Sequence, residues 1–397
     1  MSNMHDLSVT IITHSFPSEH FPVSGIFVQD NADYLSDHVG VKVISPKPKT
    51  NYLLAIIKKK WQYYRDIPML ASRKKYNIIR PEFLTYPRNY FYWRVKKSFW
   101  RAIEGHLTED SDIFHVHFLY PGGSIIPKIR EKFPNKRIFL TIHGNDWHLY
   151  KNDKKLRKTI RDSFESVDKI LTVSNSLRED IIRVFPEHAE KITVIYNGVD
   201  TGNMKLIRSN NTFISDKKIK ILMVGAFVEG KGVHVLLKAL NSINADEMET
   251  VVIGNMIDKK VYQDILKLRN NLGLKEQVKF LVSCPREKVY QYMNDCDYFI
   301  LPSLKEGFGI ALVEALLYGK PVISTFSGGP EEIVTKENGL LVPPGDINGL
   351  KEAINKMNKI YINYSSLEIA EDAQKRFGTK NITNELLNEY YKATHEC

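Results

Sequence analysis

The sequence predicts an α/β protein built from two doubly wound domains, each with a parallel sheet covered by helices on both faces. Short β-branched runs alternate with helix-length segments along the chain, and the strand-like runs are apolar almost throughout. Continuous apolar strands are typical of parallel sheets buried on both faces. A polar stretch interrupts this alternation about halfway along the 397 residues, which are too many for one ordinary core.

Six strand-like runs mark the first domain, and a helical pattern, FVQDNADYLSD, follows the first of them. The runs are LSVTIIT at 7–13, VKVIS at 41–45, IFHVH at 113–117, RIFLTI at 137–142, KILTVS at 169–174 and KITVIY at 191–196. Their rhythm of strand and helix is that of a parallel sheet.

The second domain repeats the scheme and reads as a second Rossmann-like unit. Its expected strands are IKILMVG at 219–225, TVVIG at 250–254, VKFLV at 278–282, DYFILP at 297–302, KPVIS at 320–324 and GLLV at 339–342. We place the boundary at residue 200 and the linker in the polar stretch 201–218. The domains are then 1–200 and 201–378, with a terminal helix in 379–397 packing back on the first domain. Two such domains imply a ligand cleft between the carboxyl ends of their strands.

Composition indicates a soluble globular protein without a membrane-spanning segment. Hydrophobic residues make up 43% and charged residues 26% of the chain, which is near average for packed proteins. The amino terminus lacks the basic and apolar regions of a signal peptide, and no apolar run approaches about 18 residues. The three cysteines do not have metal-ligand spacing. We therefore expect a cytoplasmic location.

Residues 50–101 form a basic and aromatic segment, with 13 basic, 2 acidic and 13 aromatic side chains. Lysine and arginine are attracted to anionic head groups, and tryptophan and tyrosine favour the membrane interface. This segment therefore suggests peripheral attachment to an anionic membrane surface, which would be the inner face of the plasma membrane. A solvated basic face whose aromatic residues lie in the core explains the composition as well. Nucleic acid is not expected as a partner, because a basic patch alone is weak evidence for it.

The segment EGFGIALVE at 306–314 carries the chemistry of the second domain. It follows an expected strand, and its glycines, Gly307 and Gly309, open a helix whose first amides suit a diphosphate or sugar hydroxyls. Glu306 lies in the loop beside these amides, and Glu314 lies one to two turns further on. A carboxylate accepts two hydrogen bonds side by side, so Glu314 matches a ribose diol and Glu306 matches sugar hydroxyls. The amides concerned are those of Phe308, Gly309 and Ile310.

This spacing of glutamates resembles the signature of retaining family 4 glycosyltransferases with the GT-B fold. Further matching motifs occur in the order found in that family, and the likeness extends over essentially the whole chain, with 47–105 the least similar part. They are TIHGNDW at 141–147, NGVD at 197–200, ILMVGAFVEGKGVHVLLKAL at 221–240, GKPVISTFSGGPEEIV at 319–334 and NGLLVPPGD at 338–346. The amino-terminal region most resembles enzymes of bacterial surface polysaccharides, such as transferases of teichuronic-acid type.

The resemblance implies roles for particular residues. Gly25 matches a glycine loop that closes on the donor diphosphate, His143 matches an active-site histidine near the transferred sugar, and Lys231 matches the lysine that counters diphosphate charge. Gly225 lies in the donor loop, but Ala226 stands where many relatives have a phosphate-binding arginine, which puts donor affinity in question. The residues expected on the acceptor side are His117, Asn145 and Asp146.

The implied reaction moves a sugar from a nucleotide diphosphate, most simply a UDP-sugar, to a hydroxyl of a saccharide or lipid-linked acceptor in cell-surface polysaccharide synthesis, with retention of configuration. The expected catalytic residues are His143, Glu306 and Lys231, and no metal or other cofactor is expected. A GT-B phosphorylase or epimerase, and a non-catalytic sugar-binding subunit of a transferase complex, are the alternatives.

Histidines and aspartates also permit a metal-site interpretation. His115 and His117 alternate on one expected strand and face the same side, which together with His143 suggests a metal site, but no carboxylate or cysteine completes the set. The aspartate pairs at 110–112 and 295–297 resemble the Asp-x-Asp motif of GT-A enzymes. Both pairs precede strands, so they are expected at the wrong end of the sheet.

Overall fold

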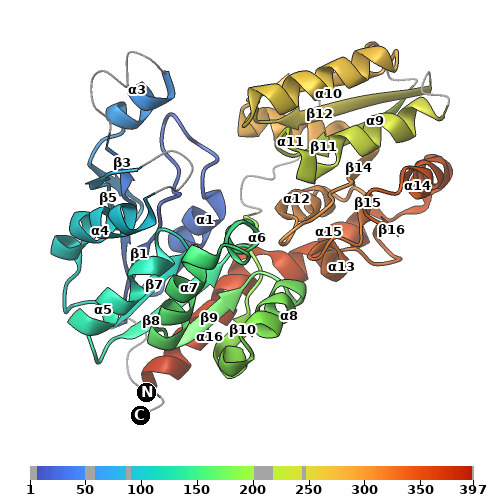
Figure 1. Ribbon diagram of the computed structural model, residues 1–397. Coiled ribbons are helices and arrows are strands. Elements are labelled where there is room, and N and C mark those ends of the chain that lie inside the picture. Colours follow the sequence, from blue (N-terminus) through green and yellow to red (C-terminus); the bar gives the residue numbers. More distant parts are fainter. Residues whose placement is uncertain (1–6, 50–58, 86–90, 201–217, 244–246, 396–397) are drawn as a thin grey trace. The chain divides into compact units, whose positions relative to one another are not determined.

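The computed structural model describes residues 7–49, 59–85, 91–200, 218–243 and 247–395. The chain divides into two compact units, Met1–Gly198 with Thr379–Cys397 and Val199–Gly378 (Figure 1). Apart from Lys218, the linker expected at 201–218 lies outside the described residues, as do residues 50–58 and 86–90 of the basic segment.

The first unit contains an eight-stranded sheet in the order β10-β9-β8-β7-β1-β2-β5-β4. All neighbouring strands pair in parallel except β4 and β5, which form an antiparallel pair. The strands are β1 (Ser8–Ile12), β2 (Gly40–Ile44), β4 (Leu70–Arg73), β5 (Tyr76–Ile79), β7 (Ile113–His117), β8 (Arg137–Ile142), β9 (Lys169–Thr172) and β10 (Ile192–Val194). A separate parallel pair joins β3 (Lys47–Pro48) to β6 (Glu82–Phe83). The six expected strands are all present.

Eight helices of this unit lie within the described residues. They are α1 (Ile26–Leu35), α3 (Lys59–Asp66), α4 (Tyr92–Ile103), α5 (Ile126–Lys132), α6 (Asn145–Tyr150), α7 (Lys154–Ser166), α8 (Asn175–Val184) and α16 (Thr379–His395). The terminal helix α16 packs beside α1 and places Ile382, Leu386 and Tyr390 in the same core as β1 and β2. Burial of such apolar side chains stabilises the fold by about 1.5–3 kcal/mol each, so α16 is part of this unit's core.

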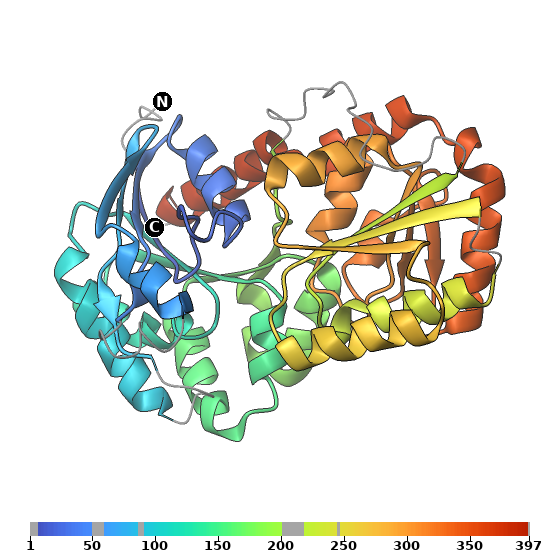
Figure 2. The same cartoon turned by 90° about the horizontal axis from the view of Figure 1, so that it is seen from above.

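The second unit contains a six-stranded parallel sheet in the order β13-β12-β11-β14-β15-β16. Its strands are β11 (Ile219–Val224), β12 (Met248–Gly254), β13 (Val278–Val282), β14 (Tyr298–Leu301), β15 (Val322–Thr325) and β16 (Gly339–Val342). Its helices are α9 (Val233–Asn241), α10 (Lys259–Asn271), α11 (Arg286–Asp295), α12 (Ile310–Leu317), α13 (Pro330–Ile333), α14 (Ile347–Ile360) and α15 (Ser366–Phe377). In Figure 2, α9 and α10 lie on one side of these strands and α12 lies on the other.

Each sheet reverses its direction of growth at one point. In the second unit this switch falls between β11 and β14, and in the first unit it falls between β1 and β7. Loops that leave two strands at such a switch diverge to opposite faces and leave room for a ligand at the carboxyl ends. The loops that carry Gly25 after β1, Gly225 and Lys231 after β11, and Glu306 after β14 therefore all lie at switch points.

Aspartates fasten the opposite, amino-terminal ends of the strands. Asp112 accepts a hydrogen bond from the backbone N–H of Ser8 at 2.9 Å, and Asp297 accepts one from Lys220 at 2.7 Å. Both aspartates belong to the Asp-x-Asp pairs that precede β7 and β14. Asp112 thus joins the start of β7 to β1, and Asp297 joins the start of β14 to β11.

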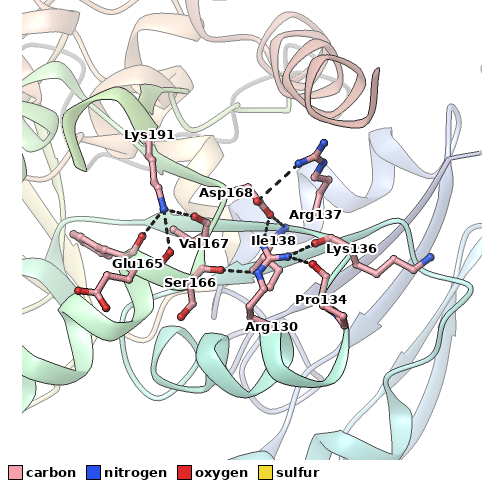
Figure 3. A network of polar contacts seen from close by, with 11 residues as sticks. Arg130, Pro134, Lys136, Arg137, Ile138, Glu165, Ser166, Val167, Asp168 and Lys191 are labelled. Carbon is pink, nitrogen blue, oxygen red and sulfur yellow. Dashed lines mark hydrogen bonds and ion pairs between the residues drawn. The ribbon is translucent and has the colours of Figure 1, made fainter. Parts of the chain in front are cut away.

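A polar network surrounds the end of α7 (Figure 3). The Arg130 guanidinium donates to Asp168 and to three backbone carbonyls, and Asp168 in turn accepts from the backbone N–H of Ile138 at 2.7 Å. The Lys191 ammonium donates to the carbonyls of Phe164, Glu165 and Val167. Carbonyls at a helix end lack partners within the helix, so these cations satisfy them.

Candidate functional site

Glu306 lies in the loop between β14 and α12, at the carboxyl end of the second sheet. The loop is held in place by its backbone, because Glu306 N–H donates to Ser327 at 2.9 Å and its carbonyl accepts from Gly329 at 3.1 Å. A side chain at Gly329 would lie 2.3 Å from the backbone of Phe308. The loop before α12 and the loop after β15 can therefore pack this closely only with glycine at that position.

Lys231 and Glu306 form an ion pair across the switch point. Lys231 Nζ lies 2.5 Å from Glu306 Oε2, and the Ser303 hydroxyl donates to the same oxygen at 3.0 Å. The Glu306 side chain is 11% exposed and that of Lys231 is 24% exposed. Gly225 lies beneath the Lys231 stem, since a Cβ there would be 3.6 Å from its carbons. Two of the three expected catalytic side chains are thus in direct contact.

The start of α12 has the backbone geometry expected of the glycine-rich segment. Gly309 precedes the helix with φ of 111°, a conformation that L side chains rarely adopt. Gly307 and Phe308 are buried, and Ile310 is the first helical residue. The amides of Phe308, Gly309 and Ile310 therefore lie at the amino end of α12, where the helix dipole favours anions.

Glu314 is paired with a residue that the sequence motifs did not indicate. Arg286 Nη2, at the start of α11, lies 3.7 Å from Glu314 Oε1, and the two side chains are 24% and 13% exposed. The guanidinium also stacks on Tyr290 at 5.1 Å from the ring centroid. Burial and the charge of Glu314 raise the pKa of Tyr318, one turn further along, to about 12. Because the pairing joins two separate helices, no local sequence pattern indicates it.

Ala226 lies in the loop directly after β11, next to Gly254. A Cβ at Gly254 would be 3.3 Å from the Ala226 Cα and 2.0 Å from the Gly225 carbonyl oxygen. The methyl group of Ala226 offers no charge to a ligand, so Lys231 is the cation that this loop contributes at the switch point.

The first unit places Gly25 in the loop between β1 and α1. Gly25 has φ of 65° and precedes the first residue of α1. A Cβ there would lie 2.1 Å from the Ser15 carbonyl oxygen. Glycine is therefore required both by the backbone conformation and by the close approach of the two loop segments.

His143 and His117 meet at the carboxyl ends of β8 and β7. Their rings are stacked 5.3 Å apart, and His117 Nδ1 lies 3.0 Å from His143 Nε2. His117 is only 4% exposed, so it lies inside the unit and supports His143. Burial, followed by the charges of His117 and His14, lowers the pKa of His143 well below its usual value, and burial lowers the pKa of His117 to about 3. Both rings are neutral at physiological pH.

Asp146 connects two loops of this region. Its carboxylate accepts hydrogen bonds from the backbone N–H groups of Leu119 at 2.9 Å and His143 at 3.1 Å. It is 5% exposed, and burial raises its pKa to about 6 in spite of these hydrogen bonds. Its described contacts position the backbone of His143. Asn145, the first residue of α6, is exposed.

His115, the third histidine of the suggested metal site, is hydrogen-bonded within the protein. His115 Nδ1 lies 2.5 Å from the Tyr390 hydroxyl, and His115 Nε2 lies 2.7 Å from the Thr141 hydroxyl. Both nitrogens of His115 are therefore occupied within the protein. Among the residues that the structure describes, no group of three or more His, Cys, Asp and Glu side chains is arranged to hold a metal ion.

Two family profiles together account for most of the chain. Residues 24–203 match the family described as Glycosyltransferase Family 4, and residues 205–376 match the family described as Glycosyl transferases group 1. An uncharacterized glycosyltransferase of Methanocaldococcus jannaschii is 33% identical over 250 residues, which cover 62% of this chain and 65% of the relative. A putative teichuronic acid biosynthesis glycosyltransferase of Bacillus subtilis, TuaC, is 24% identical over 98% of this chain and 99% of its own.

Solved structures agree on the fold. Sucrose-phosphate synthase from Thermosynechococcus elongatus has a TM-score of 0.81 at 20% identity and covers 98% of this chain and 100% of its own. Anabaena HepE in complex with UDP has a TM-score of 0.71 at 18% identity and covers 97% of this chain and 100% of its own.

The two Rossmann-like units have the GT-B fold, and the two family profiles place the chain among the glycosyltransferases of that fold. Within that class the chain belongs to glycosyltransferase family 4.

Proposed function

We propose that this protein transfers a sugar from a nucleotide diphosphate to a hydroxyl group, with retention of anomeric configuration and without a metal ion. The observation that carries this proposal is the Lys231–Glu306 pair at the switch point beside the start of α12. A cation and a helix amino terminus stabilise a departing diphosphate electrostatically, and the adjacent carboxylate suits sugar hydroxyls. Retention itself is supported by the family to which the chain belongs.

In the proposed reaction the acceptor hydroxyl attacks the anomeric carbon while the bond from that carbon to the diphosphate oxygen breaks. The nucleoside diphosphate leaves with the bonding electrons, and the acceptor proton passes to a phosphate oxygen of the leaving group. Lys231 and the first amides of α12 bind the growing negative charge. Glu306 orients the sugar, and Glu314 holds the ribose diol. His143, which is neutral, contributes hydrogen bonding near the sugar, and Asn145 is an exposed candidate for contact with the acceptor.

A UDP-sugar is the proposed donor and a saccharide or lipid-linked saccharide of a cell-surface polymer is the proposed acceptor. The UDP bound to HepE, a protein of the same fold, and the teichuronic acid assignment of TuaC support this choice. The test is calorimetric titration with UDP-, GDP- and ADP-sugars, followed by NMR analysis of the product in the presence of EDTA. A phosphate-dependent turnover or an isomerised sugar without acceptor would instead indicate a phosphorylase or epimerase. Binding of saccharide without nucleotide would indicate an accessory subunit.

We also propose that the protein acts in the cytoplasm, attached to the inner face of the plasma membrane through α4. Trp93 is 62% exposed, and Arg94 stacks on it at 4.9 Å from the ring centroid. Lys97 and Arg101 follow Trp93 at helical spacing and are exposed as well, which gives an interfacial aromatic residue flanked by cations. No helix within the described residues is both long and apolar enough to cross a membrane.

Flotation with liposomes containing anionic lipid tests this attachment. The double substitution Lys97→Gln with Arg101→Gln removes two charges from α4, and Lys356→Gln with Lys359→Gln removes two from α14 as a matched control. We expect only the α4 variant to lose flotation. Equal flotation of the two variants would contradict attachment through α4.

A further inference from the structure

Three histidine rings form a column inside the first unit. His115 stacks on His117 with centroids 4.3 Å apart, and His117 stacks on His143 at 5.3 Å. His115 and His117 are two residues apart on β7 and so face the same side of the sheet, while His143 follows β8. The column thus runs from the buried core to the half-buried ring of His143.

The inner end of the column is fixed by two hydroxyl groups. Tyr390 of α16 and Thr141 of β8 each contact one nitrogen of His115, at 2.5 and 2.7 Å. Tyr390 is fully buried and packs edge-on against Phe139 at 5.1 Å. Burial raises the pKa of Tyr390, so its hydroxyl keeps its proton. With both nitrogens bonded, the His115 ring is held in one orientation.

The outer end of the column has fewer polar restraints. His143 Nε2 meets His117, its buried Nδ1 has no hydrogen-bond partner of good geometry among the described residues, and the side chain of Asn197 interacts with the ring. Its ring packs against Phe118 at 4.5 Å and Phe27 at 4.7 Å. The ring of His143 is thus in direct contact with His117, which in turn stacks on His115.

We propose that Tyr390, near the end of the chain, is a positioning residue for His143 and acts through the stacked rings of His115 and His117. The inference rests on the proposed function in so far as His143 takes part in sugar transfer. It adds a role for α16 beyond its apolar packing, because the Tyr390 hydroxyl is not needed to fill the core. A phenyl ring at this position would occupy the same space and release His115.

Substitution of Tyr390 by phenylalanine tests the proposal, with Tyr391→Phe as the matched control in the same helix. A misplaced catalytic group costs rate more than donor binding, so we expect Tyr390→Phe to lower kcat by about 10-fold with the donor KM unchanged. Thr141→Val removes the other hydroxyl that holds His115 and should have a similar effect. The double variant should lose little more than either single variant, because both act through one ring.

Nitrogen-15 NMR of the histidine rings gives a readout that does not depend on turnover. We expect the ring signals of His115 and His143 both to shift in Tyr390→Phe and to stay in place in Tyr391→Phe. Lower thermal stability of Tyr390→Phe with an unchanged His143 signal and unchanged kcat would overturn the proposal. Shifted His143 signals in a protein that transfers no sugar would uphold the positioning and refute only the proposed function.

Discussion

Lys231 and Glu306 bind each other at 2.5 Å across the switch point of the second sheet. Both groups are charged and mostly buried, and a buried charge is stable only when it is paired. In the proposed function, a donor that places a diphosphate on Lys231 and a hydroxyl on Glu306 would replace this pair with ligand contacts. The ion pair would then keep the two groups in place before the donor binds.

Lys231→Met is predicted to lower turnover by about 10²–10³-fold, since it removes the cation that stabilises the departing diphosphate. Donor binding should weaken as well, because the loop after β11 carries Ala226 and no second cation. The measurement is initial rate against donor concentration. Lys336→Met, which disrupts a highly exposed ion pair with Glu337, is the control and should behave like the wild type.

Glu314→Ala is predicted to remove discrimination between ribose and deoxyribose. The wild type should bind UDP more tightly than 2′-deoxy-UDP by about 10-fold, the value of one hydrogen bond to a charged group. The variant should bind both alike. Arg286→Met, which leaves the carboxylate without its described partner, should reduce the discrimination partly. Equal binding of the two nucleotides by the wild type would show that Glu314 does not bind the ribose 2′-hydroxyl.

The first unit is predicted to lose stability as pH falls below 6.5. Burial lowers the pKa of His14 to about 4 and that of His117 to about 3. Below pH 6.5 these histidines therefore become protonated in the unfolded state while they stay neutral in the folded state. Each such histidine lowers the free energy of unfolding by about 1.4 kcal/mol per pH unit between the unfolded and folded pKa values. Full stability is present above pH 6.5.

Asp146 acts in the opposite direction in part of this range. Its pKa is raised to about 6 in the folded state, whereas an ordinary aspartate has a pKa of about 4. Between these two pH values the folded state binds more protons at Asp146 than the unfolded state, which offsets the loss of stability caused by one histidine. Urea unfolding at pH 7.5, 6.0 and 5.0 measures the sum. A free energy of unfolding that stays constant from pH 7.5 to 5.0 would contradict the buried neutral histidines.

Gly25→Ala is predicted to disturb the loop between β1 and α1. The new Cβ would meet the Ser15 carbonyl oxygen at 2.1 Å in a left-handed backbone conformation, which costs on the order of 1–3 kcal/mol. Both turnover and stability should decrease, since this loop matches the glycine loop that closes on the donor diphosphate in the family. Gly105→Ala has no atom within 4 Å of the added Cβ and is the control for both measurements.

The sequence was sufficient to predict twelve strands of the two parallel sheets and the positions of the glycine loops. The apolar runs from 7–13 to 339–342 each contain one strand, since continuous burial leaves a clear signal. The antiparallel pair β4 and β5 was not predicted. Its sequences, LASR and YNII, are short, and β4 is largely exposed, so neither a long apolar run nor a clean alternation marks the pair.

The contacts that complete the candidate site were also beyond sequence reasoning. Tyr390 and His115 are 275 residues apart in the sequence, and no local pattern indicates their contact. Arg286 pairs with Glu314 from a separate helix. His117 was expected to line the acceptor side, but it is 4% exposed and supports His143 from within. Local motifs place residues at the ends of strands, whereas tertiary packing decides which side chains reach the surface.

Calorimetric titration of the wild type and of Lys231→Met with UDP-, GDP- and ADP-sugars is the most direct test of a donor site at the Lys231–Glu306 pair. We expect the wild type to bind at least one nucleotide-sugar and Lys231→Met to bind it at least about 10-fold more weakly, because one charge-assisted contact is lost. The absence of binding across the panel, or equal affinity of the two proteins, would contradict a donor site at the Lys231–Glu306 pair.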